Sequence, residues 1–188
     1  VAGMVLVEAS HEDMDVRGPE AYREFAGRQR ADWVSQLDKQ RPLATFGLTA
    51  LAPGNVSVPP ALPSVKQEAY RLIKAVDGKL FAAVADEVAL LPGNLSYARG
   101  AGMKGLGGIP VVVLTRGTAT EAAPEMGLDE AAAGAWTAFW RDDLQAGLAR
   151  LSSNGRHEVV TNSGHEMHYD DPQAIADAIL EVVRAARQ

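Results

Sequence analysis

Two runs of consecutive aliphatic residues constrain the fold of this chain more than any other feature of its sequence. They cover residues 1–7 and 109–114, and a third, shorter strand is expected near residues 157–161, where Val159 and Val160 are aliphatic. Uninterrupted β-branched and aliphatic runs are typical of strands that are covered on both faces. Because helical patterns separate and follow these runs, the order of elements predicts an α/β chain with a mostly parallel sheet and right-handed crossovers.

The run at residues 1–7 should have neighbouring strands on both sides, yet nothing precedes it in this sequence. We therefore expect one of two situations. Either the chain is a piece of a longer protein, whose N-terminal segment would complete the sheet, or it forms a homodimer through an exposed sheet edge.

The segment between the first two strands, residues 16–107, is expected to form a helical insertion. Pro19 can open its first helix, Ser64 can cap its second, and Pro92 should end its third. The helices predicted for the whole chain cover residues 20–38, 65–76, 79–91, 128–151 and 172–187. A helical insertion between core strands is organised like a cap domain. The predicted fold is thus one α/β domain over residues 1–188, with a partial parallel sheet, flanking helices and a helical cap insertion.

Composition excludes several classes of function. The net charge of −6 and the scattered basic residues argue against nucleic acid as a partner. The absence of cysteine excludes disulfides, thiolate metal sites and a cysteine nucleophile, and it fits a reducing compartment, so a cytoplasmic location is expected. No apolar run approaches the roughly 20 residues that span a bilayer, and no signal peptide is visible, so no membrane association is expected.

His165 lies on a loop of small and polar residues between the last predicted strand and the last helix. In open α/β sheets the functional site lies at the carboxyl ends of the strands, and Glu8 directly follows the first strand. Glu8 and His165 could therefore converge at one edge of the sheet. A carboxylate that holds one imidazole nitrogen, while the other nitrogen faces a nucleophile, forms the acid–base pair of a catalytic triad.

Two sequence motifs resemble the α/β-hydrolase superfamily. Val-Ala-Gly-Met-Val-Leu-Val-Glu-Ala-Ser-His at residues 1–11 resembles the strand that follows the nucleophile in that family. Ser-Gly-His-Glu-Met-His-Tyr-Asp-Asp-Pro at residues 163–172 resembles its histidine loop, S-G-H-x-x-H-x-D-x-P, and residues 106–115 look like the strand between them. The resemblance implies the C-terminal portion of a capped, esterase-like serine hydrolase acting on a small-molecule, apolar-leaning substrate. His165 would be its general base and Glu8 the acid that orients it, with no cofactor and no metal.

The chain departs from that family at the nucleophile. No G-x-S-x-G motif occurs, and the closest string, Gly-Asn-Leu-Ser-Tyr-Ala at residues 93–98, has the wrong spacing. The resemblance implies that the nucleophile elbow and the oxyanion-hole loop would precede Val1. Without them acyl transfer loses its covalent step and its main electrostatic stabilisation, so we expect the isolated chain not to turn over esters.

Other residues compete for these roles. Asp13, Asp15 and Glu121 are alternative positions for the acid. His11 is expected to be a loop histidine and His168 a packing or hydrogen-bonding neighbour of His165. A metal site built on His165 and His168 has suitable spacing but lacks a third ligand with comparable support.

Two further pairs of residues have a structural interpretation. Asp170 and Asp171, which precede Pro172, are expected to be helix N-terminal carboxylates, and Trp136 and Trp140 to belong to the core. A rival function also follows from the sequence, namely a non-catalytic binding or interaction module that uses a hydrolase-like half-fold without turnover.

Overall fold

The computed structural model describes residues 1–51, 58, 63–102, 105–118 and 128–187. It contains two compact units, one formed by Val1–Phe25 with Leu95–Gln188 and the other by Ala26–Asn94. Each unit has its own packing, and the site residues Glu8 and His165 both belong to the first.

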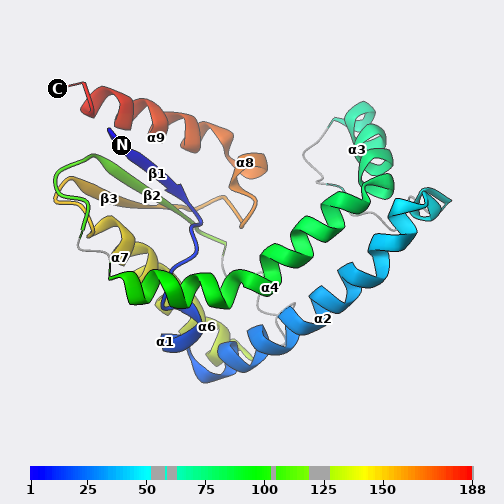
Figure 1. Cartoon of the computed structure of the whole chain (residues 1–188). Coiled ribbons are helices and arrows are strands. Elements are labelled where there is room, and N and C mark those ends of the chain that lie inside the picture. Colours follow the sequence, from blue (N-terminus) through cyan, green and yellow to red (C-terminus); the bar gives the residue numbers. More distant parts are fainter. Residues whose placement is uncertain (52–57, 59–62, 103–104, 119–127, 188) are drawn as a thin grey trace. The chain divides into compact units, whose positions relative to one another are not determined.

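The first unit is built on a parallel three-stranded sheet (Figure 1). Its strands are β1 (Met4–Val7), β2 (Val111–Arg116) and β3 (Gly155–Val160), with β2 in the centre. Met4 pairs with Val111 at one end of the β1–β2 ladder, and Arg116 pairs with Val160 at the far end of the β2–β3 ladder. The expected α/β class with a parallel sheet is therefore confirmed.

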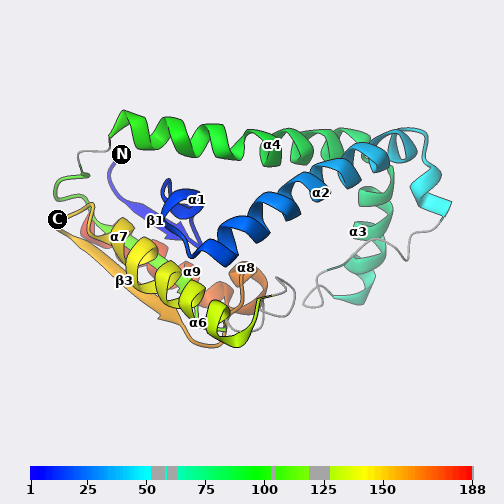
Figure 2. The same ribbon diagram turned by 90° about the horizontal axis from the view of Figure 1, so that it is seen from below.

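The central strand β2 separates two halves of the core, because alternate residues of a strand point to opposite faces. Val112 and Leu114 face α9 (Pro172–Ala185), where Ala178 and Val182 are buried against them. Val111 and Val113 face the opposite side and pack against Leu148 and Ala149. Helices therefore cover both faces of the sheet, with α9 on one side and α7 on the other (Figure 2).

The strand β1 is less enclosed than the sequence predicts. Its four residues are all of intermediate burial, whereas Val111–Thr115 of β2 are buried. Within the described residues β1 pairs with β2 alone, so the neighbour expected on its other side is not part of this sheet. The aliphatic run correctly indicated a strand, but a run of this kind cannot distinguish an edge strand from a central one.

The helix predicted over residues 128–151 is interrupted by a wider turn. It consists of α6 (Glu130–Ala138), the π-helical η4 (Phe139–Gln145) and α7 (Ala146–Ala149). The Ala146 N–H donates to the carbonyl of Arg141, five residues earlier, which is the π-helical spacing. The core position of Trp136 and Trp140 is confirmed, since both are buried, and Trp136 stacks on Tyr22 with ring centroids 3.4 Å apart.

Helices make up the second unit and connect it to the first. The elements are α2 (Glu20–Thr45), η1 (Leu48–Leu51), α3 (Ser64–Val76) and α4 (Gly78–Ala101). The prediction that helices end near residue 38 and before Pro92 is wrong, because α2 contains Pro42 and α4 contains Pro92. A proline deletes one N–H donor, yet the chain resumes its bonding beyond Pro42, whose carbonyl accepts the Phe46 N–H at 3.0 Å.

Short helices complete the first unit around the sheet. They are α1 (Met14–Arg17), which follows the loop after β1, and α8 (Met167–Asp170), which precedes α9. No helix in the described ranges combines the length and the apolar character needed to cross a membrane.

Candidate active site

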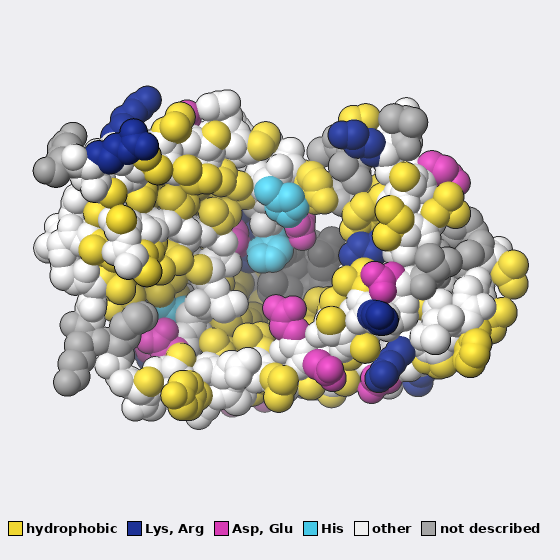
Figure 3. Space-filling view, turned by 45° about the horizontal axis from the view of Figure 1, so that its top comes forward, with side chains coloured by type: hydrophobic (Ala, Val, Ile, Leu, Met, Phe, Trp, Pro, Cys, Tyr) yellow, Lys and Arg dark blue, Asp and Glu magenta, His cyan; other side chains and the backbone are white. Residues whose placement is uncertain are grey.

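The carboxyl ends of the strands bring together residues that are far apart in the sequence. Glu8 follows β1, Arg116 ends β2, and His165 lies on the loop between β3 and α8. Glu8 Oε2 lies 3.2 Å from His165 Nδ1 although 157 positions separate the two residues. The convergence expected from the strand ends is thus present. Figure 3 shows histidine side chains beside acidic side chains on the surface of the molecule.

Glu8 occupies a strained position at the point where β1 ends. Its backbone φ is 47°, in the left-handed region that residues other than glycine rarely adopt. The Glu8 N–H still donates to the Leu114 carbonyl at 3.0 Å, so the strand ladder reaches this residue before the chain turns away. The side chain is only 3% exposed and points back across the end of the sheet.

Both oxygens of the Glu8 carboxylate have partners. Oε1 accepts the Arg116 backbone N–H at 2.8 Å and the Trp140 indole N–H at 3.4 Å. Oε2 faces His165 Nδ1 at 3.2 Å and Arg116 Nε at 3.6 Å. Burial raises the pKa of Glu8, but the hydrogen bonds with His165, Arg116 and Trp140 and the charge of Arg116 together hold this pKa below its ordinary value of 4.5. Glu8 is therefore an anion at neutral pH.

His165 is oriented on one side and open on the other. The hydrogen bond with Glu8 raises the pKa of His165 above its ordinary value of 6.5, against the lowering effects of burial and of Arg116. Its side chain is 63% exposed, and no described residue hydrogen-bonds to Nε2. In the neutral ring, a proton on Nδ1 donated to Glu8 leaves the lone pair on Nε2, where a general base needs it.

A network of main-chain contacts fixes the histidine loop. The Ser163 carbonyl accepts the N–H of Gly117 at 3.1 Å and the hydroxyl of Thr118 at 3.0 Å. Ser163 is fully buried, and the Gly164 N–H donates to Asp170 at 2.8 Å. The loop is therefore attached to the end of β2 on one side and to α8 on the other.

Asp170 and Asp171 have different roles. Asp171 caps α9 as expected, accepting the Ala174 N–H at 3.0 Å. Asp170 instead closes the histidine loop through its bond to Gly164, so its interpretation as a helix N-terminal carboxylate is wrong. It is the last residue of α8, and its side chain turns back toward the loop rather than forward to α9.

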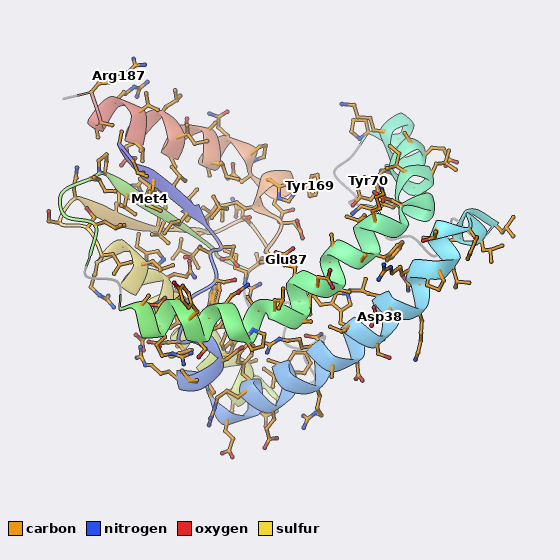
Figure 4. The ribbon with its side chains drawn as sticks, viewed as in Figure 1. Met4, Asp38, Tyr70, Glu87, Tyr169 and Arg187 are labelled. Atoms are coloured by element: carbon orange, nitrogen blue, oxygen red, sulfur yellow. The ribbon has the colours of Figure 1, made fainter. Side chains whose placement is uncertain are left out.

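The remaining candidates lie elsewhere or contact other groups. His168 is 57% exposed, lies 3.5 Å from Glu166, and its ring centroid is 4.0 Å from that of Tyr169, which extends from α8 (Figure 4). His11 accepts the Asp13 N–H at 3.1 Å.

Of the alternative acids, Asp13 forms ion pairs with Arg17 and Arg99, and Asp15 lies in α1. Glu121 falls outside the described residues. The carboxylate that the structure places on His165 Nδ1 is that of Glu8.

Three residues that contribute to the geometry were not predicted for it from the sequence. The sequence assigns no role to Arg116, and it predicts Trp140 only to be a core residue. Gln145, fully buried in η4, donates to the Ala9 carbonyl at 2.7 Å and so holds the chain next to Glu8. Their signal in the sequence is weak, because a polar atom on an otherwise apolar helix face reveals its partner only in three dimensions.

In the part of the chain that the structure describes, no group of three or more histidine, aspartate or glutamate side chains could hold a metal ion. The chain was compared with protein-family models, curated proteins and solved structures, and none of them matches it.

Proposed function

We propose that this chain is the acid- and histidine-bearing part of an esterase-like serine hydrolase of the α/β-hydrolase type, in which His165 is the general base and Glu8 orients it. One observation carries the proposal. A buried carboxylate at the end of β1 holds Nδ1 of a histidine whose ring is otherwise exposed, at the carboxyl edge of a parallel sheet. The motifs at residues 1–11 and 163–172 support the same assignment.

The proposed chemistry assigns one role to each side chain. A serine supplied by a segment that this sequence does not contain would transfer its hydroxyl proton to His165 Nε2 as its oxygen attacks the ester carbonyl carbon. The resulting imidazolium would donate that proton to the alkoxide as the carbon–oxygen bond breaks, which leaves an acyl-serine and releases the alcohol. Water would then hydrolyse the acyl-serine through the same two proton transfers. Glu8 stays ionised throughout and stabilises the imidazolium.

In this proposal the helical insertion of residues 16–107 is a cap domain. The compact unit Ala26–Asn94 lies between β1 and β2 in the sequence and exposes several large apolar side chains. Among them are Trp33, Leu43, Phe46, Leu72 and Ile73. The substrate class that the resemblance to the α/β-hydrolases implies is an apolar-leaning, small or medium ester.

Reconstitution of the serine tests this function. The chain should be joined to the N-terminal half of an α/β-hydrolase that carries G-x-S-x-G, and hydrolysis of a p-nitrophenyl ester should be followed. We expect activity that His165→Gln abolishes and Glu8→Gln lowers strongly. His168→Gln is the matched control, because the His168 side chain is similarly exposed, at 57% against 63% for His165, and lies three residues away without contacting Glu8. Full activity in the His165 variant would refute the proposal.

A second candidate, a binding module that associates through β1, is favoured by a separate observation. A groove of ≈ 360 Å³ runs between β1 and α9, and all its lining residues are apolar or glycine. They are Gly3, Val5, Val7, Ile175, Ile179, Val182 and Val183. Met4 and Glu8 direct their N–H groups to β2, so by alternation the peptide groups of Val5 and Val7 face away from it.

A second copy of the chain is the occupant that fits this edge. An antiparallel pair of β1 strands centred on Val5 would place Val5 opposite its own copy and Gly3 opposite Val7, so all the outward-facing peptide groups would find partners. Ile179→Lys should then give a monomer in sedimentation experiments. Leu180→Lys should remain dimeric, since Leu180 is equally exposed, at 48%, but does not line the groove. A monomeric unmodified chain would exclude this candidate.

A further inference from the structure

We propose that Arg116 is a positioning residue of this site. Its backbone N–H contacts one oxygen of the Glu8 carboxylate and its guanidinium the other. These two contacts fix the carboxylate that orients His165. This inference depends on the proposed function for its catalytic meaning. The geometry that supports it is independent of any substrate.

Arg116 contacts the Glu8 carboxylate at two points. Its backbone N–H reaches Oε1 at 2.8 Å, and its Nε lies 3.6 Å from Oε2. The Arg116 side chain is only 10% exposed, and its Nε has no hydrogen-bond acceptor within the described residues. A buried guanidinium whose one described carboxylate partner is Glu8 is held in place by that ion pair, and it restrains the carboxylate in turn.

Oε2 is therefore shared between two groups that compete for its charge. His165 Nδ1 approaches it to 3.2 Å and Arg116 Nε to 3.6 Å. When His165 takes up a proton, Glu8 stabilises the imidazolium while the nearby guanidinium repels it. The charged groups that act on His165 are Glu8 from the end of β1, Arg116 from the end of β2, and Glu166 from its own loop.

This arrangement has a catalytic consequence. Glu8 favours the protonated form of His165, whereas the nearby Arg116 disfavours it. Through its positive charge Arg116 therefore lowers the proton affinity of His165, and the pKa of a group that acts in turn as base and acid decides how well it does so.

The experiment is an NMR titration of the His165 ring in the intact chain, with the signal assigned by its loss in His165→Asn. Arg116→Met and Arg116→Gln should each raise the His165 pKa, since the nearby positive charge is gone. Arg141→Met is the matched control. It also removes one guanidinium, but Arg141 is exposed and paired with Asp142, so the pKa of His165 should stay unchanged.

A double substitution covers the case in which a lone buried charge prevents folding. Glu8→Gln with Arg116→Met removes both members of the ion pair, which folded proteins tolerate better than the loss of one. The His165 pKa should be higher in this double variant than in Glu8→Gln alone. Equal values in those two variants, or a shift in Arg141→Met as large as in Arg116→Met, would overturn the role of Arg116.

The titration does not depend on a serine, so its result is separate from the reconstitution test. Failure of ester hydrolysis with a clear effect of Arg116 would remove the proposed function and leave the positioning role. The reverse result would leave the Glu8–His165 pair as the acid–base machinery without Arg116.

Discussion

Replacement of Glu8 by glutamine is the most informative perturbation of this site. Glutamine has nearly the same shape and keeps a carbonyl oxygen for the Arg116 backbone N–H, but it removes the charge from a side chain that is 3% exposed. The variant would leave Arg116 buried without its counterion. Breaking a buried ion pair from one side costs about 3–5 kcal/mol, and the retained hydrogen bond should reduce the loss to about 2–3 kcal/mol.

The contribution of the Glu8–His165 pair to the stability of the folded chain depends on pH. The pKa of Glu8 is lower in the folded chain than its ordinary 4.5, so its contribution is present above pH 4.5 and is lost as the pH falls through the lower, folded value. The pKa of His165 is raised above 6.5, so its contribution is present below pH 6.5 and is lost as the pH rises through the higher, folded value. Stability should therefore decline on both sides of a mildly acidic maximum.

Urea denaturation across pH 3–9, combined with NMR titration of His165, measures both effects. In Glu8→Gln the Glu8–His165 pair should no longer contribute to the loss of stability at acidic pH or at basic pH. The pKa of His165 should also fall. Glu166→Gln is the matched control, because it removes a carboxylate that is 62% exposed from the same loop and should change stability little. An unchanged His165 pKa in Glu8→Gln would refute the reasoning, whatever happened to the stability.

Three further predictions concern the loop and its surroundings. Gly117→Ala should destabilise the chain by about 1–3 kcal/mol in urea denaturation, since a Cβ there would meet backbone atoms of Thr161 at 2.4 Å; Gly134→Ala, with open space around its Cβ, should instead be stabilising. Asp171→Ala should cost about 1 kcal/mol through loss of the α9 cap, measured in the same way. Modification by diethyl pyrocarbonate, mapped by mass spectrometry against pH, should have a higher midpoint at His165 than at His157, because the hydrogen bond with Glu8 raises the pKa of the first and burial lowers that of the second. The opposite order at the two histidines would contradict the assigned hydrogen bond.

The sequence predicts the sheet and the meeting of Glu8 with His165 for one physical reason. The carboxyl ends of parallel strands lie at one edge, so Glu8, which follows β1, and His165, on the loop after β3, come to the same edge of the sheet. The contacts of Arg116 and Trp140 could not be found in this way. Their position depends on the end of β2, which extends two residues beyond the predicted run, and on the π-helical turn, which leaves no periodic signal in the sequence.

The helix boundaries were missed where prolines occur. Pro42 and Pro92 lie inside long helices, because neighbouring turns supply enough bonds to continue the helix past one missing donor. The expectation that Pro92 ends a helix therefore fails in α4. The assignment of the helical insertion as a cap stays a prediction.

The π-helical turn η4 has a consequence for how substitutions and deletions would act on this chain. A wide turn changes the number of residues per turn, so side chains before and after it point in other relative directions than in a continuous α-helix of the same length. Trp136 stacks on Tyr22 on one side of that turn, and Leu148 packs against β2 on the other. Trp140, whose indole N–H donates to Glu8, lies inside the wide turn between these two contacts. The length of this helix, and not only its composition, is therefore part of what holds Glu8 in place.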